Sequence, residues 1–477
     1  MREQWSPSRL YAMERAPLRF AIVVLVLYAA TTLFVALHHE PWRDEAESWL
    51  VAKDVPLSEL FQWTRHDGTP ALWHLLLKPL AWLDLGYASQ TLLHLALAWI
   101  AAGVVLFLSP FTRLTKVLFL ASYYPIYQYS VVARSYVLTA LLLFVVCALY
   151  ERRHERPVAY ATVVALLFNA NLHGAVIAGF VTFAYILDRP RTRRGALAVA
   201  IMSAGALAAF LQLRPPSDAA YPGIIRFIDP DGFPFAIGNA FLPGLPRALS
   251  FSAGLIVLAL VIFALRSRPD ALLILCGSIA ILGVIFTFIW LGGYQHAGII
   301  LLVVIAGLWI GRALGDDRTQ RATAVLLNVT FLISGIYAIA IQKREIESPY
   351  SGSKEIAEFI RSNHLQDYEL AAHNPYAAVA VVPYLQGKSV WYAGLQRDGT
   401  YLSWDANLRQ AGYVSYDAAQ QRARIHFERE GKPWLLLLNV PLSLPNRRGY
   451  RLVYTTREPF RARDERYWLY EPIVRPE

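Results

Sequence analysis

Long apolar runs separated by short polar segments dominate the first 341 residues of the chain. About eleven of these runs approach the length of roughly 17–25 residues that a membrane-spanning helix needs. They cover residues 18–37, 90–108, 114–132, 135–150, 158–171, 174–187, 196–213, 249–265, 271–291, 296–310 and 322–341. A further run, 71–83, is too short to span and carries His74 and Lys78, so it predicts a helix at the membrane surface. The pattern predicts a polytopic α-helical membrane protein.

The periodicity changes after Gln342. Apolar positions three and four apart predict helices at 353–363 and 375–385, and short apolar segments predict strands at 369–372, 434–440 and 451–454. Alternation of strands and helices is typical of a small α/β domain. The chain therefore divides into a membrane module, residues 1–341, and a C-terminal α/β domain, residues 342–477.

Two longer polar segments interrupt the apolar runs. In the first loop, residues 38–89, a short helix is expected from Asp44 to about Asp54, because Pro56 disfavours helical backbone at the residue before it. Trp42, Trp49 and their neighbours at helical spacing predict that this helix lies flat on the membrane surface. The second segment, 214–248, is rich in proline and glycine and predicts an ordered lid.

Composition supports the membrane assignment. Of 477 residues, 56% are hydrophobic and 17% charged, which excludes an ordinary soluble enzyme. The net charge of +10 is spread over short clusters between apolar runs, a pattern typical of membrane orientation and not of nucleic-acid binding. The clusters are Arg2, Arg9, Arg15 and Arg19; Arg113 and Lys116; Arg152, Arg153 and Arg156; Arg189, Arg191, Arg193 and Arg194; Arg266 and Arg268; and Arg312, Arg318 and Arg321.

Parity determines the orientation, because successive spans exchange sides. With about eleven spans and a cytoplasmic N-terminus, every basic cluster falls on the cytoplasmic side and the C-terminal domain is extracytoplasmic. If 71–83 also spanned, nearly all later clusters would lie outside. The interfacial assignment of 71–83 is therefore preferred.

The adjacent acids Asp44 and Glu45 follow the first span directly. Carboxylates at a membrane edge are costly unless they are solvated, paired or used. Because neighbouring helical residues point about 100° apart, the two side chains should have different partners. One is expected to face a substrate.

Other polar residues are expected on the same side as Asp44. They are His66 and Asp67 at a Gly-Thr-Pro turn, Arg134 and Tyr136, His173, and Tyr294 and His296. Taken alone, Arg134 is equally typical of an ordinary membrane interface, and the other residues are more typical of such an interface than of a binding site. Their recurrence at several helix ends predicts a polar cavity at the outer surface. Nothing in the sequence indicates a divalent metal, and no cofactor is assigned.

Four segments resemble the GT-C superfamily of membrane glycosyltransferases, in the clan of protein O-mannosyltransferases and aminoarabinose transferases. Asp44-Glu45 resembles the acid pair of that clan, and 67–72 is similar to its proline-rich turn, with Ala71 in place of one proline and no lysine. Residues 133–138 are similar to its Ala-Arg-x-Tyr-x-Leu segment, and 172–174 to its Thr-His-Tyr-x-Gly segment. The likeness extends to about Ile310.

The resemblance implies an inverting glycosyltransferase of the bacterial inner membrane and cell envelope, which moves a sugar from a polyprenyl-phosphate donor to a hydroxyl of a glycan, lipid or protein acceptor. Asp44 would be the catalytic base, Glu45 its supporting carboxylate, and Arg134 a ligand of the donor phosphate. His173 or His296 would orient the sugar or the phosphate. Such chemistry needs a base for the acceptor proton and cationic groups for the leaving phosphate.

Two alternatives remain open at this point. A flippase for a lipid-linked sugar would carry ionisable residues near the bilayer midplane and paired broken helices. A non-catalytic membrane assembly factor would depend on its C-terminal domain and not on Asp44 or Arg134.

Overall fold

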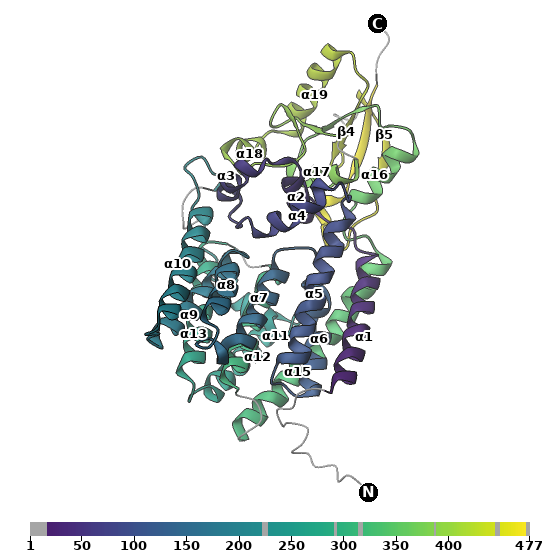
Figure 1. Ribbon diagram of the computed structural model, residues 1–477. Coiled ribbons are helices and arrows are strands. Elements are labelled where there is room, and N and C mark those ends of the chain that lie inside the picture. The colour runs from purple at the N-terminus through teal and green to yellow at the C-terminus, as the bar shows by residue number, and fades with distance from the viewer. Residues whose placement is uncertain are drawn as a thin grey trace.

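The computed structural model of the protein describes residues 17–221, 228–290, 293–312, 318–385, 388–443 and 449–473. A bundle of apolar helices forms one part, and a domain with a β-sheet stands on one end of it (Figure 1). Arg2, Arg9 and Arg15 of the predicted N-terminal cluster lie outside the described residues.

The helix bundle reproduces the predicted apolar runs, including their order. Seven described helices are long and apolar enough to cross a membrane: α1 (Leu18–Ala36), α5 (Ala88–Leu108), α10 (Arg193–Leu213), α12 (Arg247–Ala264), α13 (Pro269–Phe288), α14 (Tyr294–Gly311) and α15 (Arg318–Glu347). Shorter helices occupy the other runs: α6 (Arg113–Ala121) with the π-helical turn η2 (Tyr124–Gln128), α7 (Tyr136–Leu149), α8 (Pro157–Phe168) and α9 (Leu172–Leu187). The 3₁₀ turn η3 (Tyr150–Arg152) follows α7. The protein is an integral, multi-pass membrane protein.

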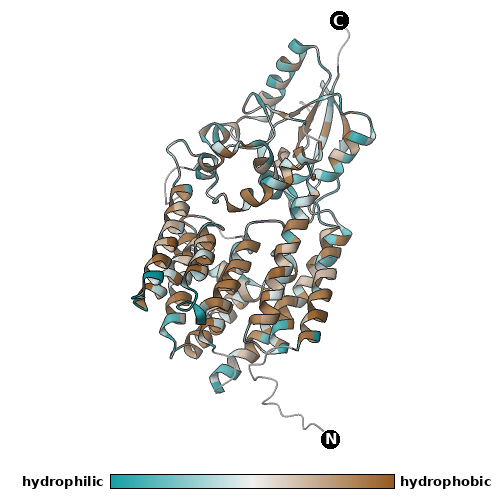
Figure 2. Ribbon diagram, viewed as in Figure 1, coloured by the Kyte–Doolittle hydropathy of each residue, from teal (hydrophilic) through white to brown (hydrophobic). Residues whose placement is uncertain are grey.

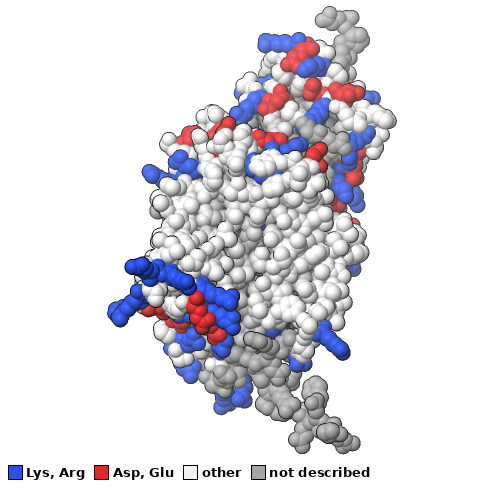
Figure 3. Space-filling model, viewed as in Figure 1, with Lys and Arg blue, Asp and Glu red and all other residues white. Residues whose placement is uncertain are grey.

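The distribution of charge agrees with this assignment. The bundle helices are hydrophobic over most of their length (Figure 2), and a belt almost free of charge crosses the bundle on the face shown in Figure 3. Lys and Arg gather at the end of the belt away from the sheet domain on the face shown in Figure 3. Charge in the hydrocarbon layer is costly, which explains why it collects at the two ends.

The first loop folds into three helices between the bundle and the sheet domain (Figure 1): α2 (Arg43–Asp54), α3 (Leu57–Asp67) and α4 (Leu72–Trp82). Gly68 ends α3 in the left-handed conformation, with φ 78°, which glycine adopts without a Cβ penalty. Lys78 of α4 donates hydrogen bonds to the carbonyls of Ala52 (3.1 Å) and Val55 (2.5 Å) at the end of α2. This buried lysine therefore holds α4 against α2.

The C-terminal domain is a mixed sheet with helices around it. The strand order is β3-β2-β1-β4-β6-β5, with β2, β1 and β4 parallel and the other pairs antiparallel. The strands are β1 (Glu369–Ala372), β2 (Val390–Tyr392), β3 (Arg397–Gly399), β4 (Trp434–Leu438), β5 (Tyr450–Thr455) and β6 (Trp468–Pro472). The helices and helical turns are α16 (Ser353–Ser362), α17 (Pro375–Ala378), η4 (Val382–Leu385), α18 (Ala406–Ala411), α19 (Tyr416–Glu430) and η6 (Arg463–Glu465).

The structure corrects three details of the sequence interpretation. Helix α2 does not lie on the surface with one face in water, because Glu45 through Ala52 are all buried beneath the C-terminal domain. The predicted helix 375–385 is divided into α17 and η4. Within 214–248, helix α11 (Gly232–Phe241) packs against α12 and α14 as part of the bundle, and none of the described residues of this segment lines the polar cavity presented below.

Candidate functional site

Asp44 and Arg134 form an ion pair in a cavity between the bundle and the C-terminal domain. The Asp44 carboxylate is 27% exposed and the Arg134 side chain 24% exposed, so both can reach a molecule in the cavity. The cavity has a volume of about 230 Å³, many times the room that one water molecule needs. Its lining includes Gln128, Tyr136, Tyr294, Gln295, Tyr350 and Arg461.

Helix α2 begins at Arg43, so Asp44 lies in its first turn, and the Asp44 side chain lines the cavity. The backbone N–H of Trp42 donates to the Glu45 carboxylate (3.3 Å), which stabilises the first turn of the helix. The Ser48 hydroxyl donates to the Asp44 carbonyl (2.9 Å). Asp44 thus lies in a well-anchored first turn, where the helix N-terminus favours a negative charge.

Glu45 points away from the cavity into a fully buried hydrogen-bonded chain. His39 lies between two carboxylates, with Nε2 at 2.9 Å from Glu45 and Nδ1 at 2.9 Å from Glu345. Burial alone would lower the pKa of His39, but the two carboxylates outweigh it and hold that pKa well above its usual value. The same charged imidazole outweighs the effect of burial on Glu45 and lowers the pKa of its carboxyl group.

This buried chain connects the acid pair to Arg134. The backbone N–H of Ala133, next to Arg134, donates to the Glu45 carboxylate (2.6 Å). Tyr127 donates its hydroxyl proton to Glu345, on the last bundle helix. Glu45 therefore positions the backbone that carries Arg134, and it does so without facing the cavity.

Two further acids lie close to Asp44. Burial, with Asp67 and Asp44 nearby, raises the pKa of Glu47 well above its usual range. The Glu47 carboxylate accepts a hydrogen bond from the Trp404 indole N–H (2.6 Å) of the C-terminal domain. Burial also raises the pKa of Asp67 to about 6. These two groups hold protons more readily than free carboxyl groups do, which reduces the negative charge around Asp44.

Two histidines lie behind the wall of the cavity. His296 Nε2 is 2.7 Å from the Tyr136 hydroxyl, and the Gly293 N–H donates to His296 Nδ1 (2.8 Å). Because Nδ1 accepts, the neutral ring carries its proton on Nε2, which can donate to Tyr136. The His173 ring stacks on His296 with 4.9 Å between ring centroids. The pair fixes Tyr136 at the cavity wall.

Of the residues that the sequence analysis singled out, Asp44, Arg134, Tyr136 and Tyr294 line the cavity. His173 and His296 lie outside the lining and hold Tyr136 in the cavity wall. Glu45 also lies outside the lining and accepts a hydrogen bond from the Ala133 N–H, next to Arg134. His66 instead faces Asp218, with 3.2 Å between Nε2 and Oδ1. Asp67 acts on the Asp44 and Arg134 charges without being part of the described lining.

Sequence reasoning missed Arg461 and Tyr350 in the wall, and His39, Glu47 and Glu345 near the acid pair. For two of these residues the sequence contained a feature that could have identified them. Glu47 follows Asp44 by three residues, the spacing of one helix face, and Glu345 is an acid at the end of an apolar helix. Arg461 and Tyr350 had none, because the contact between the two parts of the chain is not a local pattern.

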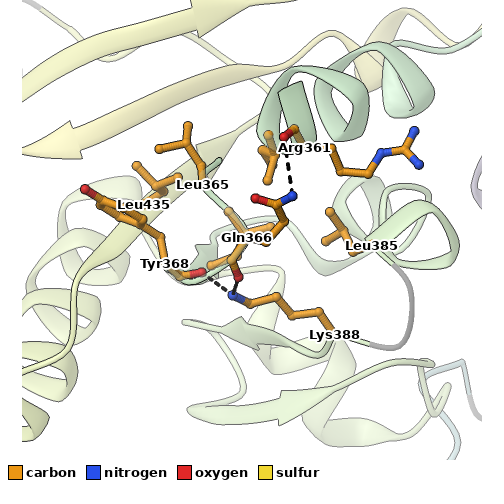
Figure 4. A pocket seen from close by; sticks show the side chains of 9 residues that line it. Arg361, Leu365, Gln366, Tyr368, Leu385, Lys388 and Leu435 are labelled. Atoms are coloured by element: carbon orange, nitrogen blue, oxygen red, sulfur yellow. Dashed lines mark hydrogen bonds between the residues drawn. The ribbon is translucent and has the colours of Figure 1, made fainter. Parts of the chain in front are cut away.

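A second cavity lies inside the C-terminal domain (Figure 4). Its volume is about 60 Å³, and Leu365, Leu385 and Leu435 contribute apolar walls. The Lys388 ammonium points at the backbone and donates to the carbonyls of Gln366 (2.6 Å) and Tyr368. The Lys388 ammonium is therefore held by backbone carbonyls.

No known family profile matches the chain, and no curated protein matches it. Two solved structures are similar to it over almost their whole length. ArnT from Cupriavidus metallidurans bound to undecaprenyl phosphate is 15% identical, with a TM-score of 0.56, and the match covers 96% of this chain and 99% of ArnT. ArnT in the apo state is 13% identical, with a TM-score of 0.57 and coverage of 96% and 100%. The chain therefore has the same fold as ArnT, which confirms the prediction of a polytopic helical protein with a small C-terminal α/β domain.

Proposed function

We propose that the protein is an inverting glycosyltransferase that moves a sugar from a polyprenyl-phosphate donor to an acceptor hydroxyl group at the outer face of the bacterial inner membrane. One observation carries the proposal: a carboxylate and a guanidinium, both partly exposed, face one polar cavity at the end of the membrane bundle. The ArnT structure with bound undecaprenyl phosphate has the same fold and supports a polyprenyl-linked donor.

The ion pair suggests an order of events. In the structure, Arg134 neutralises Asp44. A donor phosphate competes for the guanidinium, whose fork matches phosphate oxygens. Asp44 is then released to accept the proton of the acceptor hydroxyl as its oxygen attacks the anomeric carbon. The bond from that carbon to the phosphate oxygen breaks, Arg134 stabilises the leaving polyprenyl phosphate, and a single displacement inverts the anomeric configuration.

The other groups have supporting roles in this proposal. Glu45 positions Arg134 through the Ala133 N–H, and Tyr136, held by His296, offers a hydroxyl group at the cavity wall. The cavity lies where the chain of a polyprenyl donor could remain in lipid while its head group enters the polar space. The proposal does not specify the sugar or the acceptor class.

The test is transfer of sugar from a polyprenyl-phosphate sugar by purified protein in liposomes. Asp44→Asn should lower the rate about 10²- to 10⁴-fold, because the amide cannot accept the proton. Glu59→Gln changes an exposed acid on the neighbouring helix α3 and should retain the wild-type rate. Wild-type activity in Asp44→Asn would remove Asp44 from the base role, and flux of the lipid-linked sugar without any transfer product would favour a flippase instead.

A further inference from the structure

The C-terminal domain contributes Arg461 to the wall of the Asp44 cavity. The residue lies in the connection between β5 and β6. Its guanidinium carbon is 4.6 Å from the centre of the Tyr294 ring, and one guanidinium nitrogen is 3.5 Å from the Tyr123 hydroxyl. The cavity thus has a guanidinium from each part of the protein.

The backbone around Arg461 is held in place on both sides. The N–H of Phe460 donates to the Pro349 carbonyl (3.0 Å), and the N–H of Ala462 donates to the Tyr350 carbonyl (3.0 Å). These bonds tie the β5–β6 connection to the segment that leaves α15. Arg461 therefore has a defined position above the bundle.

The two guanidinium groups differ in whether a carboxylate neutralises their charge. Asp44 neutralises Arg134. Arg461 forms no ion pair with any carboxylate of the described residues; its polar and aromatic neighbours are tyrosines. Because arginine stays charged in proteins, Arg461 is a half-buried cation that has no carboxylate partner in the part of the chain that the structure describes. Such a group lowers its energy by binding an anion.

We propose that Arg461 is a second phosphate-binding residue of the donor site, supplied by the C-terminal domain. Arg461 binds the donor phosphate first, while Arg134 is still paired with Asp44. Arg134 then leaves Asp44 and binds the same phosphate, so that both guanidinium groups contact the leaving phosphate. This inference rests on the proposed function. It assigns the C-terminal domain a part in donor binding, which explains why the β5–β6 connection is fastened beside the cavity.

The test measures binding of undecaprenyl phosphate and of uncharged undecaprenol to the full-length protein in detergent. Arg461→Gln should weaken binding of the phosphate about 10- to 100-fold and leave undecaprenol binding unchanged. Arg463→Gln is the matched control, because Arg463 is an exposed arginine on the same connection and is not part of the described lining. Arg461→Lys keeps the charge and should retain more phosphate binding than Arg461→Gln.

Each result decides the question. Phosphate binding at wild-type strength in folded Arg461→Gln overturns the inference, and so does an equal loss of undecaprenol binding, since that would show a general disturbance of the cavity. If Arg461→Gln does not fold, Arg461→Met, which keeps an unbranched chain over the Tyr294 ring, is tested with the same two outcomes. Wild-type protein that binds no polyprenyl phosphate contradicts the proposed function itself.

Discussion

Asp44 and Glu45 are adjacent, yet only the Asp44 side chain reaches the cavity. Helix geometry predicts this divergence, since neighbouring side chains point about 100° apart. Glu45 pairs with the nearby His39, but the second carboxylate on that imidazole could not be predicted, because Glu345 lies at a sequence separation of 306 from His39. The three groups form a buried chain with a single positive charge between two negative ones.

Glu45→Gln should destabilise the protein by about 3 kcal/mol, because it removes one partner of a buried ion pair. The folded-state pKa of His39 is raised, so its contribution is complete below the unfolded value near 6.5 and is lost as the pH rises through the folded value. The pKa of Glu45 is lowered, so its contribution is present above about 4.5 and is lost as the pH falls.

The difference in melting temperature between wild type and Glu45→Gln should therefore be largest from about pH 5 to pH 7 and should shrink on either side. Thermal unfolding in detergent across this range measures it. Glu59→Gln should show little difference at any pH, because its side chain is exposed. A pH-independent difference for Glu45→Gln would mean that charge does not hold this chain together.

At several places in the bundle a glycine packs against an aromatic ring so closely that a Cβ atom would have no room. Gly298 lies in the first turns of α14, whose described residues from His296 to Gly311 are all buried. A Cβ built there would be 2.3 Å from Tyr124 Cδ1 and 2.4 Å from the Tyr129 hydroxyl oxygen. The glycine thus lets η2 pack against α14, next to Gln128 and Tyr294 of the cavity wall.

Gly298→Ala should lower the melting temperature by several degrees and reduce transfer, because packed rings have no room to move away from a methyl group. Gly103→Ala in α5 is the control. Its added Cβ would meet only Phe107 Cδ2, at 4.0 Å, so the better helix propensity of alanine should leave stability equal or slightly higher. Thermal unfolding and transfer assays compare the two variants, and equal behaviour would contradict the packing argument.

The two parts of the molecule meet through buried polar contacts above α2. Glu465 accepts hydrogen bonds from the Ser351 hydroxyl (2.6 Å) and from the Arg43 backbone N–H (3.2 Å), at the start of α2. Arg43 pairs with Asp464 through its side chain. Burial outweighs these contacts and raises the pKa of Glu465 to about 8. The Glu465 carboxyl group therefore keeps its proton to a higher pH than a free carboxyl group does.

Because this folded-state pKa is raised, the contribution of Glu465 to stability is complete below about pH 4.5 and declines as the pH rises toward 8. Glu465→Gln keeps a neutral side chain at every pH. Relative to wild type, its melting temperature should rise steadily between pH 5 and pH 8, which thermal unfolding of both proteins in the same buffers checks. A constant difference would show that Glu465 is already ionised in the folded protein.

Patterns along the chain were sufficient to predict the helix bundle, a short helix within 71–83 (α4), the α/β character of the C-terminal part, and two residues of the cavity wall, Asp44 and Arg134. Span length, basic clusters and local motifs are one-dimensional signals, since each depends on neighbouring residues and the membrane. Strands β2 and β3 escaped prediction because three residues each are too few for a periodic signal, and β6 was also missed, although it is as long as β4.

Only the tertiary structure brings together, at one end of the bundle, five residues from distant parts of the sequence: His39, Glu45, Arg134, Glu345 and Arg461. The physical reason is that burial and ion pairing depend on which parts of the chain meet, and that meeting is decided by packing between the bundle, α2 and the C-terminal sheet domain. Asp44 and Arg134 were identifiable from the sequence as candidate site residues. Their ion pair, the buried chain beside it and the second guanidinium in the cavity wall follow from the tertiary structure alone.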